Sequence, residues 1–92
     1  MIKGFKHRGL KQLFKKGNAA GIAPSMSPRL QRVLDAVDRA SSPLDLMIPG
    51  FETHQLKGDR KGTWSITITG NWRITFKFEG LDVVQVNLED YH

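Results

Sequence analysis

The sequence contains no cysteine, and no stretch of it is apolar for more than a few residues. Without cysteine there is no disulfide framework and no cysteine-ligated zinc or iron–sulfur site. The short apolar runs exclude a membrane-spanning helix, which needs about 20 consecutive apolar residues. The first residues also lack the apolar block of a signal peptide. These absences predict a cytosolic protein that holds together by packing alone.

Acidic residues are missing from the first third of the chain. Residues 1–34 contain no Asp or Glu and carry a local charge of +8, whereas residues 35–92 carry −3. A concentrated basic surface attracts polyphosphate by releasing its counterions. Nucleic acid is therefore the favoured partner, and the alternative is a solvated helix face kept soluble by lysine. The basic residues of this segment are Lys3, Lys6, Arg8, Lys11, Lys15, Lys16, Arg29 and Arg32.

The length and the balance of residue types predict one folded domain. The chain has 92 residues, enough for one domain and too few for two. Apolar residues make up 39% and charged residues 25%, which is typical of a globular rather than a disordered chain. We therefore expect a single domain over residues 1–92.

The first half of the chain predicts a short strand and two helices. Residues 1–5 are expected to form the strand. Apolar residues then recur at helical spacing, which predicts a basic helix over residues 8–16 that stops at Gly17. A second helix is expected to begin after an N-cap at Ser27 and to run to about Ala40. Its apolar stripe consists of Leu30, Val33, Leu34 and Val37.

The second half of the chain changes to the alternation of β-strands. Residues 63–69 and 71–78 alternate apolar with polar side chains, and a last strand is expected over about 82–88. The expected core residues of the last strand are Val84, Val86 and Leu88. The fold class is therefore α+β, with two N-terminal helices packed on a small, mostly antiparallel sheet.

The turn at Gly70 and Asn71 decides the register of the central hairpin. A two-residue loop would place apolar and polar side chains on the same face, so we expect an odd-length turn in which one of these residues takes positive φ. The pairs that keep one face apolar are Ile68 with Trp72, Ile66 with Ile74, and Trp64 with Phe76. In this register Thr67 lies beside Arg73 on the opposite face.

Basic residues gather where they suit RNA cleavage without a metal ion. Such cleavage needs groups that move protons and cations that stabilise the extra charge on the phosphate. His54, Lys57, Arg60 and Lys61 lie within eight residues, and Arg73 is expected on the polar face of its strand. Histidine suits proton transfer, and arginine offers phosphate a planar fork of donors. The alternative is a charged surface loop beside a solvated sheet face.

The last three residues are a second candidate group. A hydrophobic strand runs almost to the C-terminus and would hold Asp90, Tyr91 and His92 in place. Tyr91 could stack on a base. Asp90 could orient a histidine or accept a hydrogen bond from a base edge. The alternative is an ordinary polar tail.

The histidines do not predict a metal site. The chain has His7, His54 and His92, and no two of them lie at ligand spacing on one element. No metal and no other cofactor is therefore expected.

Three separated motifs resemble those of the HigB branch of the RelE-like toxins, the toxin halves of bacterial type II toxin–antitoxin systems. They are HQLKGDRKGTWSI beginning at His54, NWRITFKF beginning at Asn71, and EDYH at residues 89–92. The resemblance covers nearly the whole chain, although residues 18–50 match only in pattern. It implies a compact α+β fold of the RelE-like type.

The resemblance also implies an activity, which is ribosome-dependent endoribonuclease cleavage of mRNA in the ribosomal A site. Such cleavage stops translation in the bacterial cytoplasm. The family's site positions, carried onto this chain, are His54, Lys57, Arg73, Asp90, Tyr91 and His92. They coincide with the candidates chosen above on chemical grounds.

The expected mechanism is attack by a ribose 2′-OH, which leaves a 2′,3′-cyclic phosphate and a 5′-hydroxyl. His92 is expected to be the principal acid/base group and His54 to assist, with the assignment of base and acid open. Lys57 and Arg73 are expected to hold the scissile phosphate and its developing charge.

The resemblance implies several partners. A HigA-type helix-turn-helix antitoxin would neutralise the toxin, and DNA would be reached only through that antitoxin. The other partners are the 70S ribosome, with its 16S rRNA, and mRNA, while no membrane partner is expected. The basic residues of positions 1–34, with Arg60 and Lys61, are assigned to RNA contact.

Two other classes of function are alternatives to the ribosome-dependent endoribonuclease. One is an RNA-binding module that uses the same basic face without cleavage. The other is a ParE-like inhibitor of DNA gyrase, which shares the fold but generally lacks this set of histidine, lysine, arginine and Asp-Tyr-His residues.

Overall fold

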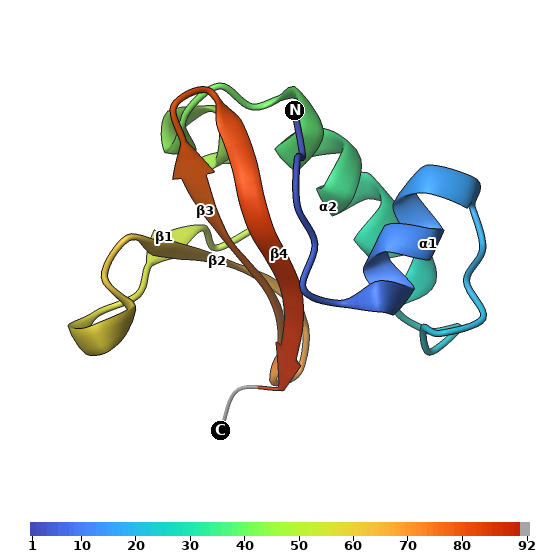
Figure 1. The fold of residues 1–92 in the computed structure, drawn as a ribbon. Helices are drawn as coiled ribbons and strands as arrows, with labels where there is room; N and C mark the ends of the chain where they lie inside the picture. Colours follow the sequence, from blue (N-terminus) through green and yellow to red (C-terminus); the bar gives the residue numbers. More distant parts are fainter. Residues whose placement is uncertain (91–92) are drawn as a thin grey trace.

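Two helices precede an antiparallel sheet in the computed structural model, which describes residues 1–90 (Figure 1). Within these residues the elements are α1 (Arg8–Lys16), α2 (Ser27–Arg39), the 3₁₀ turn η1 (Pro43–Leu46), β1 (His54–Gln55), the 3₁₀ turn η2 (Gly58–Arg60), β2 (Thr63–Thr69), β3 (Trp72–Glu79) and β4 (Asp82–Asp90). The strands lie in the order β1-β2-β3-β4, and each is antiparallel to its neighbour. The predicted α+β class, with two N-terminal helices before a mostly antiparallel sheet, is confirmed.

The first helix has the predicted bounds and a defined cap at each end. The Nδ1 atom of His7 accepts a hydrogen bond from the Leu10 amide at 3.1 Å, which satisfies one of the free N–H groups of the first turn. At the other end Gly17 adopts φ 65, a left-handed conformation that glycine takes without steric cost. Leu10 and Leu13 are buried in the core.

The second helix begins one residue differently from the prediction. Met26, not Ser27, holds the N-cap position, because a turn that starts at Ala23 runs directly into the helix. Ser27 is therefore the first helical residue, and the predicted N-cap at Ser27 is wrong. Helix α2 ends at Arg39, close to the predicted end. The predicted apolar stripe is confirmed, since the fully buried residues of α2 are Leu30, Val33, Leu34 and Val37.

The central hairpin has most of the predicted register. The confirmed partners are Trp64 with Phe76, Ile66 with Ile74, and Thr67 with Arg73. The predicted partner of Trp72 is wrong, because Thr69 rather than Ile68 lies opposite it. The predicted odd-length turn is also wrong, because Thr69 and Trp72 enclose a two-residue loop, Gly70–Asn71, and a β-bulge between Thr67 and Thr69 absorbs the odd residue instead. Gly70 takes the predicted positive φ, at 54°. Trp72, expected in the core, is 37% exposed at the start of β3.

A second bulge changes which side chains of β4 reach the core. The prediction placed Val84 inside, but Val83 is buried and Val84 is only partly so. Gln85 adopts φ 55, and the register between β3 and β4 shifts near it. The extra residue reverses the alternation, so that Val83 and Val86 both face the core.

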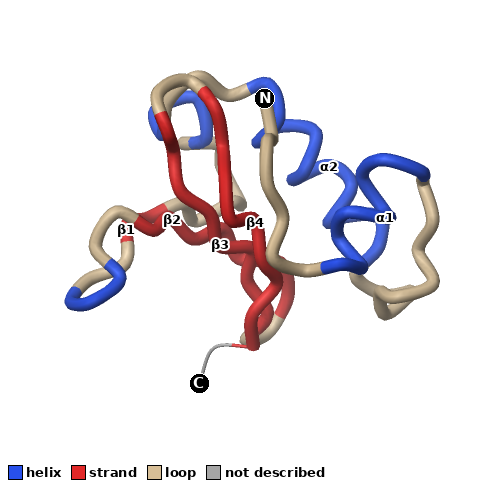
Figure 2. Tube along the Cα trace, viewed as in Figure 1, coloured by secondary structure: helices blue, strands red, loops and turns tan. Residues whose placement is uncertain are grey.

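The N-terminal segment extends the sheet beyond β4. Ile2 and Phe5 form parallel bridges with Val83 and Val86, and the segment runs beside β4 before it enters α1 (Figures 1 and 2). Ile2 is buried as predicted, but the segment forms two isolated bridges rather than the strand predicted over residues 1–5.

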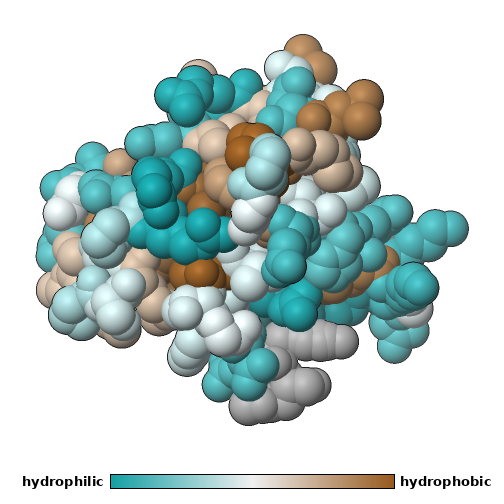
Figure 3. All heavy atoms as spheres, turned by 180° about the vertical axis from the view of Figure 1, so that it is seen from behind, coloured by the Kyte–Doolittle hydropathy of each residue, from teal (hydrophilic) through white to brown (hydrophobic). Residues whose placement is uncertain are grey.

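The sheet separates an apolar layer from a polar one. Helices α1 and α2 lie on one side of the sheet, whereas the connection from β1 to β2, with the turn η2, projects on the other side (Figures 1 and 2). Ser65 and Thr75 belong to the polar face and are nevertheless buried there. Viewed from behind, most of the surface is hydrophilic, with small apolar patches (Figure 3). Within residues 1–90, the helices are all too short to cross a membrane.

Candidate active site

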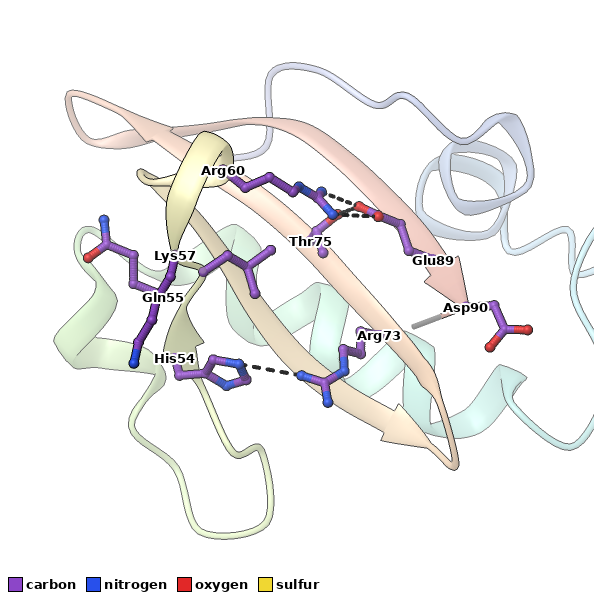
Figure 4. Close-up of a pocket in the computed structure, with 9 residues that line it drawn as sticks. His54, Gln55, Lys57, Arg60, Arg73, Thr75, Glu89 and Asp90 are labelled. Atoms are coloured by element: carbon purple, nitrogen blue, oxygen red, sulfur yellow. Dashed lines mark hydrogen bonds and ion pairs between the residues drawn. The ribbon is translucent and has the colours of Figure 1, made fainter. Parts of the chain in front are cut away.

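A cavity of about 490 Å³ opens on the polar face of the sheet, between the β1–β2 connection and strands β3 and β4. It brings together five residues that the sequence singled out, namely the catalytic candidates His54, Lys57, Arg73 and Asp90 and the RNA-contact candidate Arg60 (Figure 4). Tyr91 and His92, the other two catalytic candidates, lie outside the described residues. The cavity is also lined by residues to which sequence reasoning gave no role, which are Gln55, Leu56, Thr75 and Glu89.

The hydrogen bonds of His54 define its tautomer. Its Nδ1 atom lies 3.0 Å from the Glu52 carbonyl oxygen, and its Nε2 atom lies 3.4 Å from Nη1 of Arg73. A carbonyl only accepts and a guanidinium only donates, so the geometry fits a neutral ring with its proton on Nδ1. Glu52 itself adopts φ 51, which costs a non-glycine residue about 1–2 kcal/mol. The contact with the Glu52 carbonyl thus directs Nε2 toward Arg73 in the cavity.

Strand β3 supports Arg73 across from His54. Arg73 lies opposite Thr67 of β2 and Glu89 of β4, so its backbone is fixed from both sides. Its Nη1 atom is also 3.5 Å from Oγ of Ser65, which is fully buried. The guanidinium is therefore positioned by an ordered sheet rather than by a loop, as preorganised stabilisation of charge requires.

Lys57 points to the opposite side of its extended segment from His54 (Figure 4). Successive residues of an extended segment point to opposite sides. In Figure 4 His54 points toward Arg73, whereas Gln55 and Lys57 extend away from it on the other side of the segment. Lys57 is exposed at the cavity rim, where its amine is accessible to a large ligand.

The carboxylate of Glu89 lines the cavity, and both of its oxygens accept hydrogen bonds. It accepts two hydrogen bonds from the Arg60 guanidinium, at 2.8 and 2.6 Å, and a third from Oγ1 of Thr75. The hydrogen bonds from Arg60 hold the pKa of the Glu89 carboxyl below its usual range. The sequence gave one signal for Glu89, since strand alternation places it on the face of Arg73. Its partner Arg60 is 29 positions away and was not predictable.

Asp90 ends β4 on the other face of the strand. It lies opposite Trp72, and strand alternation separates its side chain from that of Glu89. In Figure 4 the Asp90 carboxylate is directed away from His54 and Arg73. Among the described residues, no three His, Cys, Asp or Glu side chains are grouped as metal ligands are.

The predicted RNA-contact residues divide into two groups. Arg29 is half-buried and donates to the backbone carbonyls of Gly50, at 2.7 Å, and Thr67, at 2.8 Å, while its guanidinium lies 5.8 Å from the centre of the Phe51 ring. This geometry favours a structural role for Arg29. The others are exposed, namely Lys3, Lys6, Arg8, Lys11, Lys15, Lys16, Arg32, Arg60 and Lys61.

Comparison with known proteins gives two matches. Residues 3–92 match the family model of the HigB-like toxins, described as the RelE-like toxin of the type II toxin–antitoxin system HigB. The chain is also 48% identical over 92 residues to the endoribonuclease HigB of Proteus vulgaris, and the match covers 100% of both chains.

Proposed function

This chain belongs to the HigB-like family of RelE-type toxins of type II toxin–antitoxin systems, and from that membership we propose that it is an endoribonuclease that cuts mRNA in the ribosomal A site. Its relative of 48% identity is named an endoribonuclease. The observation that carries the proposal is the contact between His54 and Arg73 in an open cavity, where Nε2 of His54 lies 3.4 Å from Nη1 of Arg73. This pair offers a proton acceptor beside a fixed cation.

The proton transfers are divided between two histidines. The tautomer of His54 supports its role as the base, because Nε2 is an acceptor and faces Arg73 in the cavity. When the phosphate binds, it takes the Arg73 donor and releases Nε2 to accept a proton. His54 takes the proton of the ribose 2′-OH as that oxygen attacks the adjacent phosphorus. The bond from phosphorus to the 5′-oxygen then breaks, and His92 donates a proton to the departing oxygen. The products are a 2′,3′-cyclic phosphate and a 5′-hydroxyl.

The remaining site residues bind and stabilise the RNA. Arg73 holds the non-bridging oxygens of the phosphate while negative charge develops on them, and its support by the sheet makes this stabilisation preorganised. Lys57 at the rim neutralises the phosphate from the outside. Tyr91 packs on the mRNA, and Asp90 orients His92 or contacts the codon.

The ribosome supplies the substrate in this proposal. The exposed basic residues of positions 1–34 contact 16S rRNA, and the 70S ribosome presents mRNA in its A site in the cytoplasm. The cognate partner of the type II system is an antitoxin, which we propose to be HigA-like, and DNA is reached only through it.

A substrate with one altered sugar tests the mechanism. Programmed 70S ribosomes are loaded with all-ribose mRNA or with the same mRNA carrying a 2′-deoxy nucleotide at the cut site. The proposal predicts cleavage of the first and resistance of the second, because the deoxy sugar lacks the attacking oxygen. Normal cleavage of the deoxy substrate would show that the mechanism is wrong.

A further inference from the structure

An ion pair joins the tip of the β1–β2 connection to the far strand of the sheet. We call residues 54–62 the β1–β2 arm. Arg60 at its tip donates from Nη1 to Oε1 of Glu89 at 2.8 Å and from Nη2 to Oε2 at 2.6 Å. Glu89 Oε2 also accepts a hydrogen bond from Thr75 on β3. Because Glu89 belongs to β4, the contact crosses the polar face of β3 (Figure 4).

The backbone attaches the arm to the sheet at its base. Strand β1 is two residues long, and the Leu56 amide donates to the Thr63 carbonyl at 2.8 Å. Beyond that bond the arm turns at Gly58 and Gly62, with φ values of 68° and 95°. Glycine adopts these positive φ values without steric cost, and they let the backbone turn sharply on both sides of the tip. The position of the tip over the sheet therefore depends on side-chain contacts.

The ion pair uses both oxygens of one partner and two nitrogens of the other. A planar guanidinium and a carboxylate match in this geometry, which gives direction as well as attraction. The hydrogen bonds from Arg60 lower the pKa of Glu89, so that Glu89 is ionised at neutral pH. The same bond raises the pKa of Arg60 above its usual value. This occupied guanidinium favours a structural role over the RNA contact that the sequence predicted for Arg60.

Building on the proposed function, we infer that Glu89 is a positioning residue for cleavage, acting through Arg60. The base of the arm, which carries His54, is joined to β2 through the two-residue strand β1 and the Leu56 bond. By holding the tip of the arm against β4, Glu89 supports this short attachment and the geometry that sets His54 against Arg73. Glu89 does not touch the reacting atoms. Its loss lets the arm move away from β3, and the proton acceptor then leaves the fixed cation.

Single-turnover cleavage on programmed ribosomes separates positioning from RNA contact. Glu89→Gln and Arg60→Ala should each lower the maximal rate by about 10²-fold, the loss that a displaced catalytic group can cause. The toxin concentration for half-maximal rate should change little in both. If Arg60 instead bound RNA, Arg60→Ala would raise that concentration, whereas Glu89→Gln would free Arg60 and leave it unchanged or lower. A raised half-maximal concentration in Arg60→Ala, with no such rise in Glu89→Gln, would therefore overturn the inference.

A double variant and a matched control complete the kinetic test. If the two residues act as one unit, Arg60→Ala combined with Glu89→Gln should be no slower than either single variant. Multiplied losses would mean independent roles and would contradict the inference. Glu79→Gln makes the same chemical change at an exposed position at the end of β3 and should cleave like the wild type. Circular dichroism melting establishes that each variant is folded.

Hydrogen exchange of backbone amides tests whether Glu89 holds the β1–β2 arm against the sheet, and it needs no cleavage assay. The Leu56 amide donates to the Thr63 carbonyl at the base of the arm, and the Lys61 amide donates to the Gly58 carbonyl within the arm. In Glu89→Gln both amides should exchange faster, whereas the amide of Leu30 in α2 should not. Unchanged exchange of the arm amides would overturn the inference. If the wild type failed to cut any mRNA, the proposed function would fail, and this exchange measurement would still decide whether Glu89 holds the arm.

Discussion

Nε2 of His54 lies 3.4 Å from Nη1 of Arg73, although the two residues come from strands separated by β2. The arrangement places a proton acceptor beside a cation in the cavity where a phosphate would bind. We therefore expect Arg73→Ala to lower the cleavage rate by about 10²–10³-fold, as the loss of one preorganised donor does elsewhere. Single-turnover cleavage measures this effect. Lys77→Ala removes another cation of β3 and should cleave normally, so equal losses in both variants would contradict a specific role for Arg73.

Arg29 and Arg32 are expected to behave oppositely although both belong to the basic N-terminal third. Arg29 donates to two backbone carbonyls and joins α2 to β2, so Arg29→Ala should lower the free energy of unfolding by about 1–3 kcal/mol. Arg32 is exposed, and its replacement by alanine should change that free energy by less than about 0.5 kcal/mol. Urea unfolding measures both values. Equal stability of the two variants would refute the structural role of Arg29.

The cap of α1 makes a separate stability prediction. His7→Ala removes the acceptor of the Leu10 amide and should cost about 1 kcal/mol of unfolding free energy. His7→Asn retains a side-chain acceptor at the N-cap and should recover most of that loss. Thermal or urea unfolding decides the matter, and a His7→Asn variant as unstable as His7→Ala would show that the cap bond contributes little.

Acid should weaken the contact between Glu89 and Arg60. The pKa of Glu89 is lowered in the folded chain, mainly by Arg60, with smaller contributions from Thr75 and the charge of Lys6. The unfolded carboxyl has its ordinary pKa of about 4.5, so the stabilisation is complete above that pH and is lost as the pH falls through the lower folded value. The difference in unfolding free energy between wild type and Glu89→Gln should therefore shrink below about pH 4.5. A constant difference on acidification would contradict the ion pair.

Ribosome binding should depend on salt through the exposed lysines and arginines of the N-terminal third. Each phosphate contact contributes about 0.7–0.9 to the slope of log affinity against log salt concentration. Replacing Lys11, Lys15 and Arg32 by alanine together should weaken binding and flatten the slope. A slope equal to that of the wild type would mean that these residues do not contact rRNA phosphates.

Local patterns predicted the helices and the central pairing of the sheet. Helix α1 was predictable because its apolar spacing and the glycine after it act within a few residues. The pairing of Ile66 with Ile74 followed from the need to bury one face. The bulge at Gln85 was not predictable, since it depends on how β4 fits against β3 and the N-terminal segment. It moved the buried position from Val84 to Val83.

The sequence selected several residues that line one cavity, but it did not predict the contacts between them. The chemistry of RNA cleavage selected His54, Lys57 and Arg73, which line one cavity. The role of Glu89 was missed because its partner Arg60 comes from a turn that folds back over the sheet. No local pattern encodes such a contact between distant segments.

Cleavage mapping on programmed 70S ribosomes shows whether this protein cuts mRNA in the A site. Primer extension locates the cuts made by wild type and by His54→Ala and His92→Ala, with naked mRNA as a second substrate. We expect cuts within the A-site codon that require the ribosome and are lost in both variants. Cutting of naked mRNA would remove the ribosome requirement. Absence of cutting by folded wild-type protein would contradict the nuclease account and leave RNA binding without cleavage or gyrase inhibition.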